Sequence, residues 1–83
     1  MRPVVRLLGK SQCRLCEEAR AMLEQLQPKL RFIIEDVNVE LDPSLRERFG
    51  EQVPVVEVNG EVVLTAPIRK RALEDALEDA LAR

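Results

Sequence analysis

Apolar and polar positions follow two different periods along this chain and divide it into short elements. Val4–Leu8 is an apolar, β-branched run ended by Gly9, which is typical of a buried strand. From Cys13 to Gln27 the apolar residues recur at helical spacing, so we expect a helix that Pro28 ends. The segment 30–39 is rich in Phe, Ile and Val and predicts a second strand. A helix joining two such strands implies a βαβ unit with a parallel pair.

Two further helices are predicted in the second half of the chain. Asp42 is a good N-cap, and Pro43 stands at the first helical position that follows it. A short helix should therefore cover 44–49 and end at Gly50 in the left-handed conformation. Near the end of the chain, apolar residues from Ile68 to Leu81 recur on one face of a closing amphipathic helix.

A β-hairpin is predicted between these helices. The runs 53–58 and 61–64 are apolar and flank Asn59-Gly60, and this dipeptide supplies the positive φ angles of a two-residue type I′ turn. The order of elements is therefore β-α-β-α-β-β-α. We find no internal repeat or linker and expect one domain over residues 1–83.

Composition limits the partners that we expect. The chain has 83 residues, only two aromatic residues and a formal net charge of −2, so its core must be mainly aliphatic. A duplex-binding module usually presents a strongly basic face, and this near-balanced charge gives no such signal. We interpret the densest basic run, 69–71, as a solvated helix start and expect no nucleic-acid partner.

The location of the protein bears on how its two cysteines are interpreted. The first residues are too soon interrupted to form a secretory apolar region, and no apolar run reaches membrane-spanning length. We therefore expect a cytoplasmic protein without membrane contact. In a reducing cytosol a cysteine pair is more often catalytic or metal-binding than a permanent cross-link. One bridge across so short a loop would also constrain the unfolded chain little.

Both cysteines lie in one C-x-x-C motif, Cys13 and Cys16, at the predicted start of the first helix. In a βαβ unit this placement is the cue for a thioredoxin-like redox pair. The helix N-terminus should lower the pKa of Cys13, and positive charge on Lys10 and Arg14 acts in the same sense. We therefore expect Cys13 to attack a substrate disulfide and the shielded Cys16 to resolve the mixed disulfide.

Other roles for the cysteine pair stay open at this stage. An external thiol could resolve the mixed disulfide, and this route would need only Cys13. A structural zinc site needs four ligands, whereas this chain has two cysteines and no histidine. A dimer or an added thiol could complete an iron–sulfur or metal site in which Cys13 is a ligand. A non-catalytic binding module is a third reading. We assign no metal ligand within the chain.

Pro54 is the second candidate feature. A lone X–Pro bond is usually trans, and a proline at the start of a strand needs no special role. Next to a redox pair, a cis bond is the alternative, and it would turn the Val53 backbone toward the thiols. There it could pair with an extended substrate segment.

With these motifs in place, the sequence resembles the glutaredoxin family, and most closely the small bacterial glutaredoxin-like proteins. That family has a lysine three residues before the first cysteine, as Lys10 stands before Cys13. Its T-V-P motif, with a cis proline, resembles Val53-Pro54 with Gln52 in place of threonine. The resemblance covers nearly the whole chain. It implies a thioredoxin-like α/β fold, a mixed four-stranded sheet with helices on both faces.

The resemblance also implies a function, that of a thiol–disulfide oxidoreductase whose substrates are protein or small-molecule disulfides. Lys10 and the Val53 backbone would hold glutathione as a co-substrate, with no tightly bound cofactor, and glutathione or a reductase would supply electrons to a monomer. The family's P-Y pair between the cysteines is here Arg14-Leu15, and its later Gly-Gly and Asp are absent from 64–68. Cys13 and Cys16 are thus the predicted catalytic residues, and Lys10, Arg14, Val53 and Pro54 the predicted substrate-binding residues.

Overall fold

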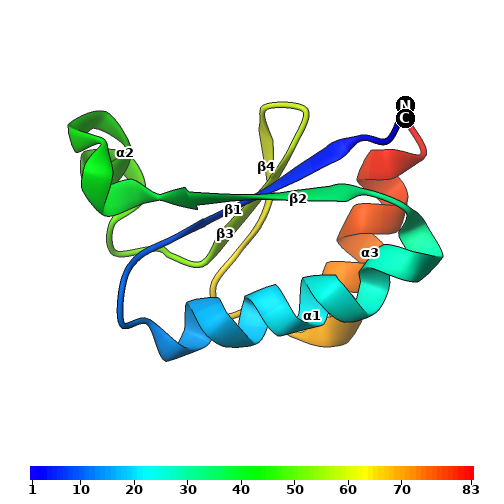
Figure 1. Cartoon of the computed structure of the whole chain (residues 1–83), viewed down its shortest axis with the longest axis horizontal. Coiled ribbons are helices and arrows are strands. Elements are labelled where there is room, and N and C mark those ends of the chain that lie inside the picture. The colour runs from blue at the N-terminus through cyan, green and yellow to red at the C-terminus, as the bar shows by residue number, and fades with distance from the viewer.

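The computed structural model describes all 83 residues and follows the predicted order of strands and helices, with one short 3-10 helix added after the second strand (Figure 1). The elements are β1 (Val4–Gly9), α1 (Arg14–Leu30), β2 (Ile33–Asn38), η1 (Val39–Leu41), α2 (Pro43–Phe49), β3 (Val55–Val58), β4 (Glu61–Thr65) and α3 (Lys70–Leu81).

The four strands form one mixed sheet in the order β2-β1-β3-β4. β1 and β2 are parallel because α1 connects them, whereas β3 pairs antiparallel with both β1 and β4. Asn59 and Gly60 have φ angles of 53° and 82°, which confirms the predicted positive-φ turn between β3 and β4. The predicted mixed sheet is therefore present, with β1 at its centre.

Helices cover both faces of this sheet and divide the core into two parts. α1 and α3 lie side by side on one face, and α2 lies on the other, near one end of the sheet (Figure 1). Alternation along β1 directs Leu7 into the first part and Leu8 into the second. Each part contains one of the two aromatic residues of the chain. Phe32 lies in the first part and Phe49 in the second, and both are buried.

The first helix corrects a prediction, because Pro28 lies inside α1 and does not end it. A proline lacks one N–H, and near the end of a helix this loses a single backbone bond. The helix therefore continues to Leu30, whose side chain packs against the first part of the core. Arg31 ends it in the left-handed conformation, and its N–H donates to the Gln27 carbonyl at 2.8 Å. β2 consequently starts at Ile33, three residues later than predicted.

Gly50 corrects a second prediction, since its φ of −54° is right-handed. After α2 the chain makes a turn, which is closed by a hydrogen bond of 2.8 Å from the Gln52 N–H to the Phe49 carbonyl. A Cβ atom on Gly50 would lie 2.5 Å from the Arg46 carbonyl oxygen. Glycine is required here because the backbone approaches closely, and not because φ is positive.

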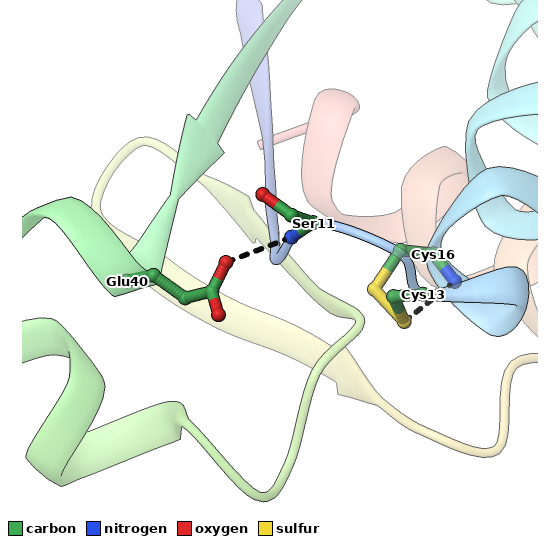
Figure 2. Close-up of a disulfide and its surroundings, with 4 residues drawn as sticks. All are labelled: Ser11, Cys13, Cys16 and Glu40. Carbon is green, nitrogen blue, oxygen red and sulfur yellow. Dashed lines mark hydrogen bonds between the residues drawn. A yellow bond between two sulfur atoms is a disulfide. The ribbon is translucent and has the colours of Figure 1, made fainter.

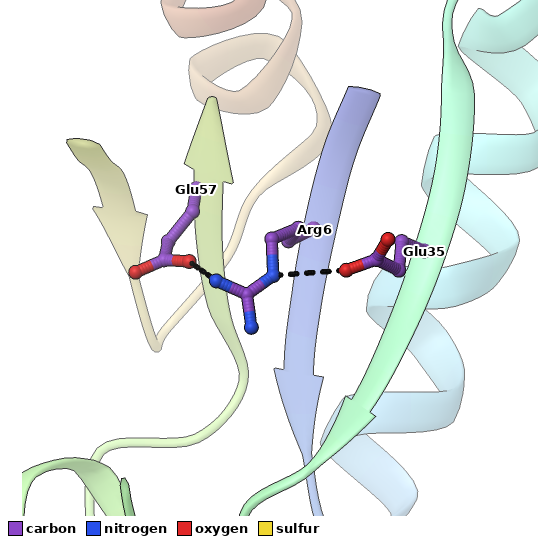
Figure 3. A network of polar contacts seen from close by, with 3 residues as sticks. All are labelled: Arg6, Glu35 and Glu57. Carbon is purple, nitrogen blue, oxygen red and sulfur yellow. Dashed lines mark hydrogen bonds and ion pairs between the residues drawn. The ribbon is translucent and has the colours of Figure 1, made fainter. Parts of the chain in front are cut away.

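An ion-pair network joins three neighbouring strands, β2, β1 and β3, on the sheet face that also carries Leu8 (Figure 3). Arg6 of β1 donates from Nη1 to Oε1 of Glu57 at 2.8 Å, and its Nε lies 3.1 Å from Oε1 of Glu35. The Glu57 side chain is only 9% exposed, so Arg6 is the group that neutralises a buried carboxylate.

Replacing Arg6 by Met should lower the free energy of unfolding by about 1–3 kcal/mol, because Glu57 then stays buried without its charged partner. Urea denaturation at neutral pH measures this change. Arg71→Met is the matched control, since its partner Asp75 is 61% exposed and an exposed pair contributes little. Equal losses in the two variants would contradict the importance of the network.

Candidate active site

The two cysteines form a disulfide at the N-terminus of α1 (Figure 2). Cys13 is the N-cap of the helix, with φ −119° and ψ 104°, and its Cα lies 5.3 Å from that of Cys16. The backbone N–H of Cys16 donates to the Cys13 Sγ at 3.2 Å. A sulfur atom thus takes the place that a Ser or Asp oxygen usually occupies at a helix N-cap.

The two sulfur positions differ in exposure. Cys16 is only 7% exposed and packs on Gly9, where an added Cβ would lie 3.2 Å from both the Cβ and the Sγ of Cys16. Cys13 is half-buried and packs at the edge of the second core cluster. Cys13 is therefore the more accessible of the two cysteines, as the sequence predicted.

The peptide bond between Val53 and Pro54 is cis, the alternative that the sequence left open. Val53 is buried in the second core cluster, which also contains Cys16 and against which Cys13 packs. A second cis bond, Ala66–Pro67, follows β4, and no sequence signal singled it out. The two segments are joined, because the Ala66 N–H donates to the Pro54 carbonyl at 3.0 Å.

A pocket of about 340 Å³ opens at the cysteine pair, between the start of α1 and the end of β2. Lys10, Cys13 and Cys16 line it, so the structure brings these three predicted residues together. Two charged residues of its wall, Arg20 and Asp36, were not predicted from the sequence, because their positions on α1 and β2 resemble ordinary solvated faces.

Three predicted site residues, Arg14, Val53 and Pro54, do not line this pocket. The Arg14 side chain is 91% exposed and forms an ion pair with Glu18 at 3.3 Å, one turn along the helix. Its charge is near Cys13 in the sequence, yet its guanidinium is engaged at the surface of α1.

Two hydrogen bonds hold the loop that leads into the cysteines, and Figure 2 shows the one that Glu40 accepts. The Ser11 N–H donates to Oε1 of Glu40 at 3.0 Å, and Nδ2 of Asn38 lies 3.3 Å from the Ser11 Oγ. Hydrogen bonds from the backbone and side chain of Ser11 lower the pKa of Glu40 below its ordinary value of 4.5, and the nearby charges of Lys10 and Arg46 add to this. The 3-10 helix η1 therefore positions the loop before Cys13.

Comparison with known proteins identifies the family of this site. Residues 4–81 match the family model described as Glutaredoxin-like domain (DUF836). The chain belongs to this family. An uncharacterized protein of Mycobacterium tuberculosis, Rv0508, is 33% identical over 64 residues, a match that spans 71% of this chain and 66% of that relative, just under two thirds of its length.

Solved structures confirm the predicted thioredoxin-like fold. A protein of X. campestris, XcR50, superposes with a TM-score of 0.80 and 26% identity, covering 92% of this chain and 97% of its own. Ne2328 of Nitrosomonas europaea gives a TM-score of 0.78 at 23% identity, over 90% of this chain and 91% of its own. Thioredoxin-2 of a malaria parasite gives 0.65 at 15% identity, over 94% and 82%.

The family, the fold and the Cys13–Cys16 disulfide together support a redox role for the C-x-x-C pair. No group of three or more His, Cys, Asp or Glu side chains is arranged to hold a metal ion. None of the helices combines the length and the apolar character that a membrane span requires.

The hydrogen bond that Glu40 accepts from Ser11 predicts that the stability of the fold depends on pH. A carboxylate whose pKa is lower in the folded state stabilises the fold above the unfolded-state value near 4.5, and this contribution is lost as the pH falls through the folded-state value. The difference in melting temperature between the wild type and Glu40→Gln should therefore be greatest at neutral pH and shrink below 4.5.

Glu47→Gln is the control for this pH series, because Glu47 is an exposed residue of α2 that makes no ion pair. Its melting temperature should follow that of the wild type at each pH. A difference for Glu40→Gln that stays constant through the acid range would show that the carboxylate charge does not stabilise the loop.

Proposed function

We propose that this glutaredoxin-like domain is a thiol–disulfide oxidoreductase in which Cys13 is the nucleophile and Cys16 the resolving thiol. The observation that carries the proposal is the hydrogen bond from the Cys16 N–H to the Cys13 Sγ at the N-cap of a 17-residue helix. In the reduced protein the same N–H and the positive end of the helix dipole would stabilise a Cys13 thiolate. The thiolate is the form of cysteine that attacks disulfides.

The reaction then takes two exchange steps. The Cys13 thiolate attacks one sulfur of a substrate disulfide, a Cys13–substrate disulfide forms, and the other half of the substrate leaves as a thiolate. Cys16 next loses its proton and attacks the Cys13 sulfur, which closes the Cys13–Cys16 bridge and releases the second half. The two cysteines supply two electrons, and the two released thiolates take up protons to become thiols.

The segment before β3 supports a polypeptide as one class of substrate. Neither the N–H nor the carbonyl of Val53 makes a hydrogen bond within the protein, and Val53 belongs to the core cluster that contains Cys16. An extended chain could pair with these two groups as a short added strand. A side-by-side arrangement of this kind would bring a substrate disulfide to Cys13.

The remaining parts of the proposal concern the setting of the reaction. Lys10 lines the pocket at the cysteines and could hold a carboxylate of glutathione, which we propose as a co-substrate. Glutathione or a reductase would return electrons to the disulfide, and we propose that the domain works as a monomer in the cytoplasm. Protein or small-molecule disulfides would be the substrates.

Mass spectrometry in a glutathione redox buffer tests the assigned roles. The wild type should shift between a dithiol and an internal disulfide as the buffer becomes more oxidising. Cys16→Ser should instead accumulate one glutathione on Cys13, because the resolving thiol is missing. Cys13→Ser is the matched variant, and its buried Cys16 should react much more slowly.

Two results would overturn the proposal. One is equal glutathione capture by the two serine variants, which would remove the distinction between nucleophile and resolving thiol. The other is a wild-type dithiol that does not exchange with the buffer at all, which would leave the fold without this activity.

A further inference from the structure

The pocket between α1 and β2 combines charged walls with the reactive cysteines. Its volume of about 340 Å³ is at the small end of the range for ligand pockets, roughly 300–1,000 Å³. Both cysteines line it, so a group held there lies next to the site of disulfide exchange. A cavity of this size accommodates part of a small molecule and not a folded segment.

The pocket exists because β2 changes from apolar to polar along the face that α1 covers. Ile34 packs against the first core cluster, but the next residues on the same face are Asp36 and Asn38. In the register of the sheet they lie beside Leu7 and Gly9 of β1, close to the cysteines. At these two positions β2 therefore presents polar side chains to the first turns of the helix.

The charges around this space are balanced. Lys10 and Arg20 are positive, and Glu17 and Asp36 are negative. A ligand that is only an anion would face two carboxylates, and a ligand that is only a cation would face two basic groups. A ligand that carries both charges can pair with both kinds of side chain.

Arg20 makes only long contacts with its ion-pair partners in the protein. Its Nη2 lies 3.5 Å from Oδ2 of Asp36 and 3.8 Å from Oε2 of Glu24, both beyond normal hydrogen-bond length. Its Nη1 is buried and has no hydrogen-bond partner. Protein atoms cover Nη1 as the side chain stands, so the guanidinium has to turn toward the pocket before it can bind a carboxylate with two parallel bonds.

We propose that this pocket binds the α-amino acid group of a small thiol, with the carboxylate at Arg20 and the ammonium at Asp36, while the sulfur of that thiol is joined to Cys13. The proposal rests on the oxidoreductase function above. In the first exchange step the retained half of the disulfide occupies the pocket, and the other half leaves as a thiolate. In the second step Cys16 attacks the Cys13 sulfur and the retained half leaves in turn, so that two electrons pass from the cysteines to the substrate.

This pocket is separate from the segment at Val53. β1 lies between β2 and β3 in the sheet, so the pocket and the Val53 backbone flank the cysteines from different sides. The small thiol and a peptide could thus occupy their own surfaces at the same time.

A panel of symmetrical disulfides separates the two charges of the ligand. In the Cys16→Ser background, the rate of Cys13 mixed-disulfide formation is measured with cystine, with cystamine (ammonium only), with dithiodipropionic acid (carboxylate only) and with neutral hydroxyethyl disulfide. Salt at about 1 M shortens the screening length to about 3 Å, so that differences report close contacts.

Arg20→Gln should slow cystine and dithiodipropionic acid by about three- to tenfold and leave cystamine unslowed, because only the carboxylate contact is lost. Asp36→Asn should slow cystine and cystamine by a similar factor and leave dithiodipropionic acid unslowed. Arg71→Gln and Asp75→Asn, an exposed pair on α3, are matched controls that should change none of these rates. Hydroxyethyl disulfide should react at the same rate in every variant.

Glutathione disulfide is the last member of the panel, since a γ-glutamyl group also carries an α-ammonium and an α-carboxylate. If it shows the cystine pattern, the pocket accepts the group from a peptide thiol. If only cystine shows it, free cysteine is the source.

The proposal is overturned if either variant slows hydroxyethyl disulfide as much as cystine, or if neither variant changes any rate. Because that neutral substrate reports Cys13 alone, its reaction with the parent Cys16→Ser variant leaves the oxidoreductase function intact under either result. Conversely, a parent variant that reacts with none of the disulfides would contradict the proposed function itself.

Discussion

The site is organised around one hydrogen bond, from the Cys16 N–H to the sulfur of Cys13 at the N-cap of α1. A helix begins with N–H groups that have no partner within the helix, and here a sulfur atom accepts from one of them. The three-residue spacing that makes this contact also brings the two cysteines close enough for a disulfide, with Cα atoms 5.3 Å apart. The local geometry of the helix start thus provides both the cross-link and the means to stabilise a thiolate.

The rest of the fold holds this helix start in place. β1 lies in the middle of the sheet and directs Leu7 and Leu8 into the two parts of the core, so the strand that leads to the cysteines is anchored on both faces. Gly9 ends that strand and leaves room for Cys16 to pack against it. Glu40 then binds the Ser11 N–H from the 3-10 helix after β2. The loop before Cys13 is therefore held by the central strand β1, by the packing of Cys16 against Gly9 and by the hydrogen bond to Glu40.

The elements that the sequence predicted well are those with strong local signals. The Asn59-Gly60 turn and the N-cap at Asp42 depend on side chains next to the backbone that they shape, and both form as expected. Pro28 and Gly50 were misjudged because tertiary contacts outweigh their usual preferences. Packing of Leu30 carries the helix past the proline, and a close backbone approach at Arg46 accounts for the glycine.

The residues of the candidate site were likewise predicted where they are close in the sequence and not where they meet only in the fold. The cysteine pair and Lys10 follow one another along the chain, so a short motif was enough to find them. Arg20 and Asp36 are 16 residues apart in the sequence and meet only because α1 crosses over β2. The brace from Glu40 to Ser11 spans 29 residues and depends on the same parallel pairing. Charged residues on a helix and an edge strand carry no signal of such a meeting.

The most direct test of the central claim is the pKa of the Cys13 thiol in the reduced protein. It is obtained from the rate of alkylation of the Cys16→Ser variant by iodoacetamide as a function of pH, so that only one thiol reports. Stabilisation by the Cys16-position N–H and the helix dipole predicts a pKa well below the value of about 8.5 for a free cysteine. A pKa equal to that of a free cysteine would contradict the claim that the helix start activates Cys13.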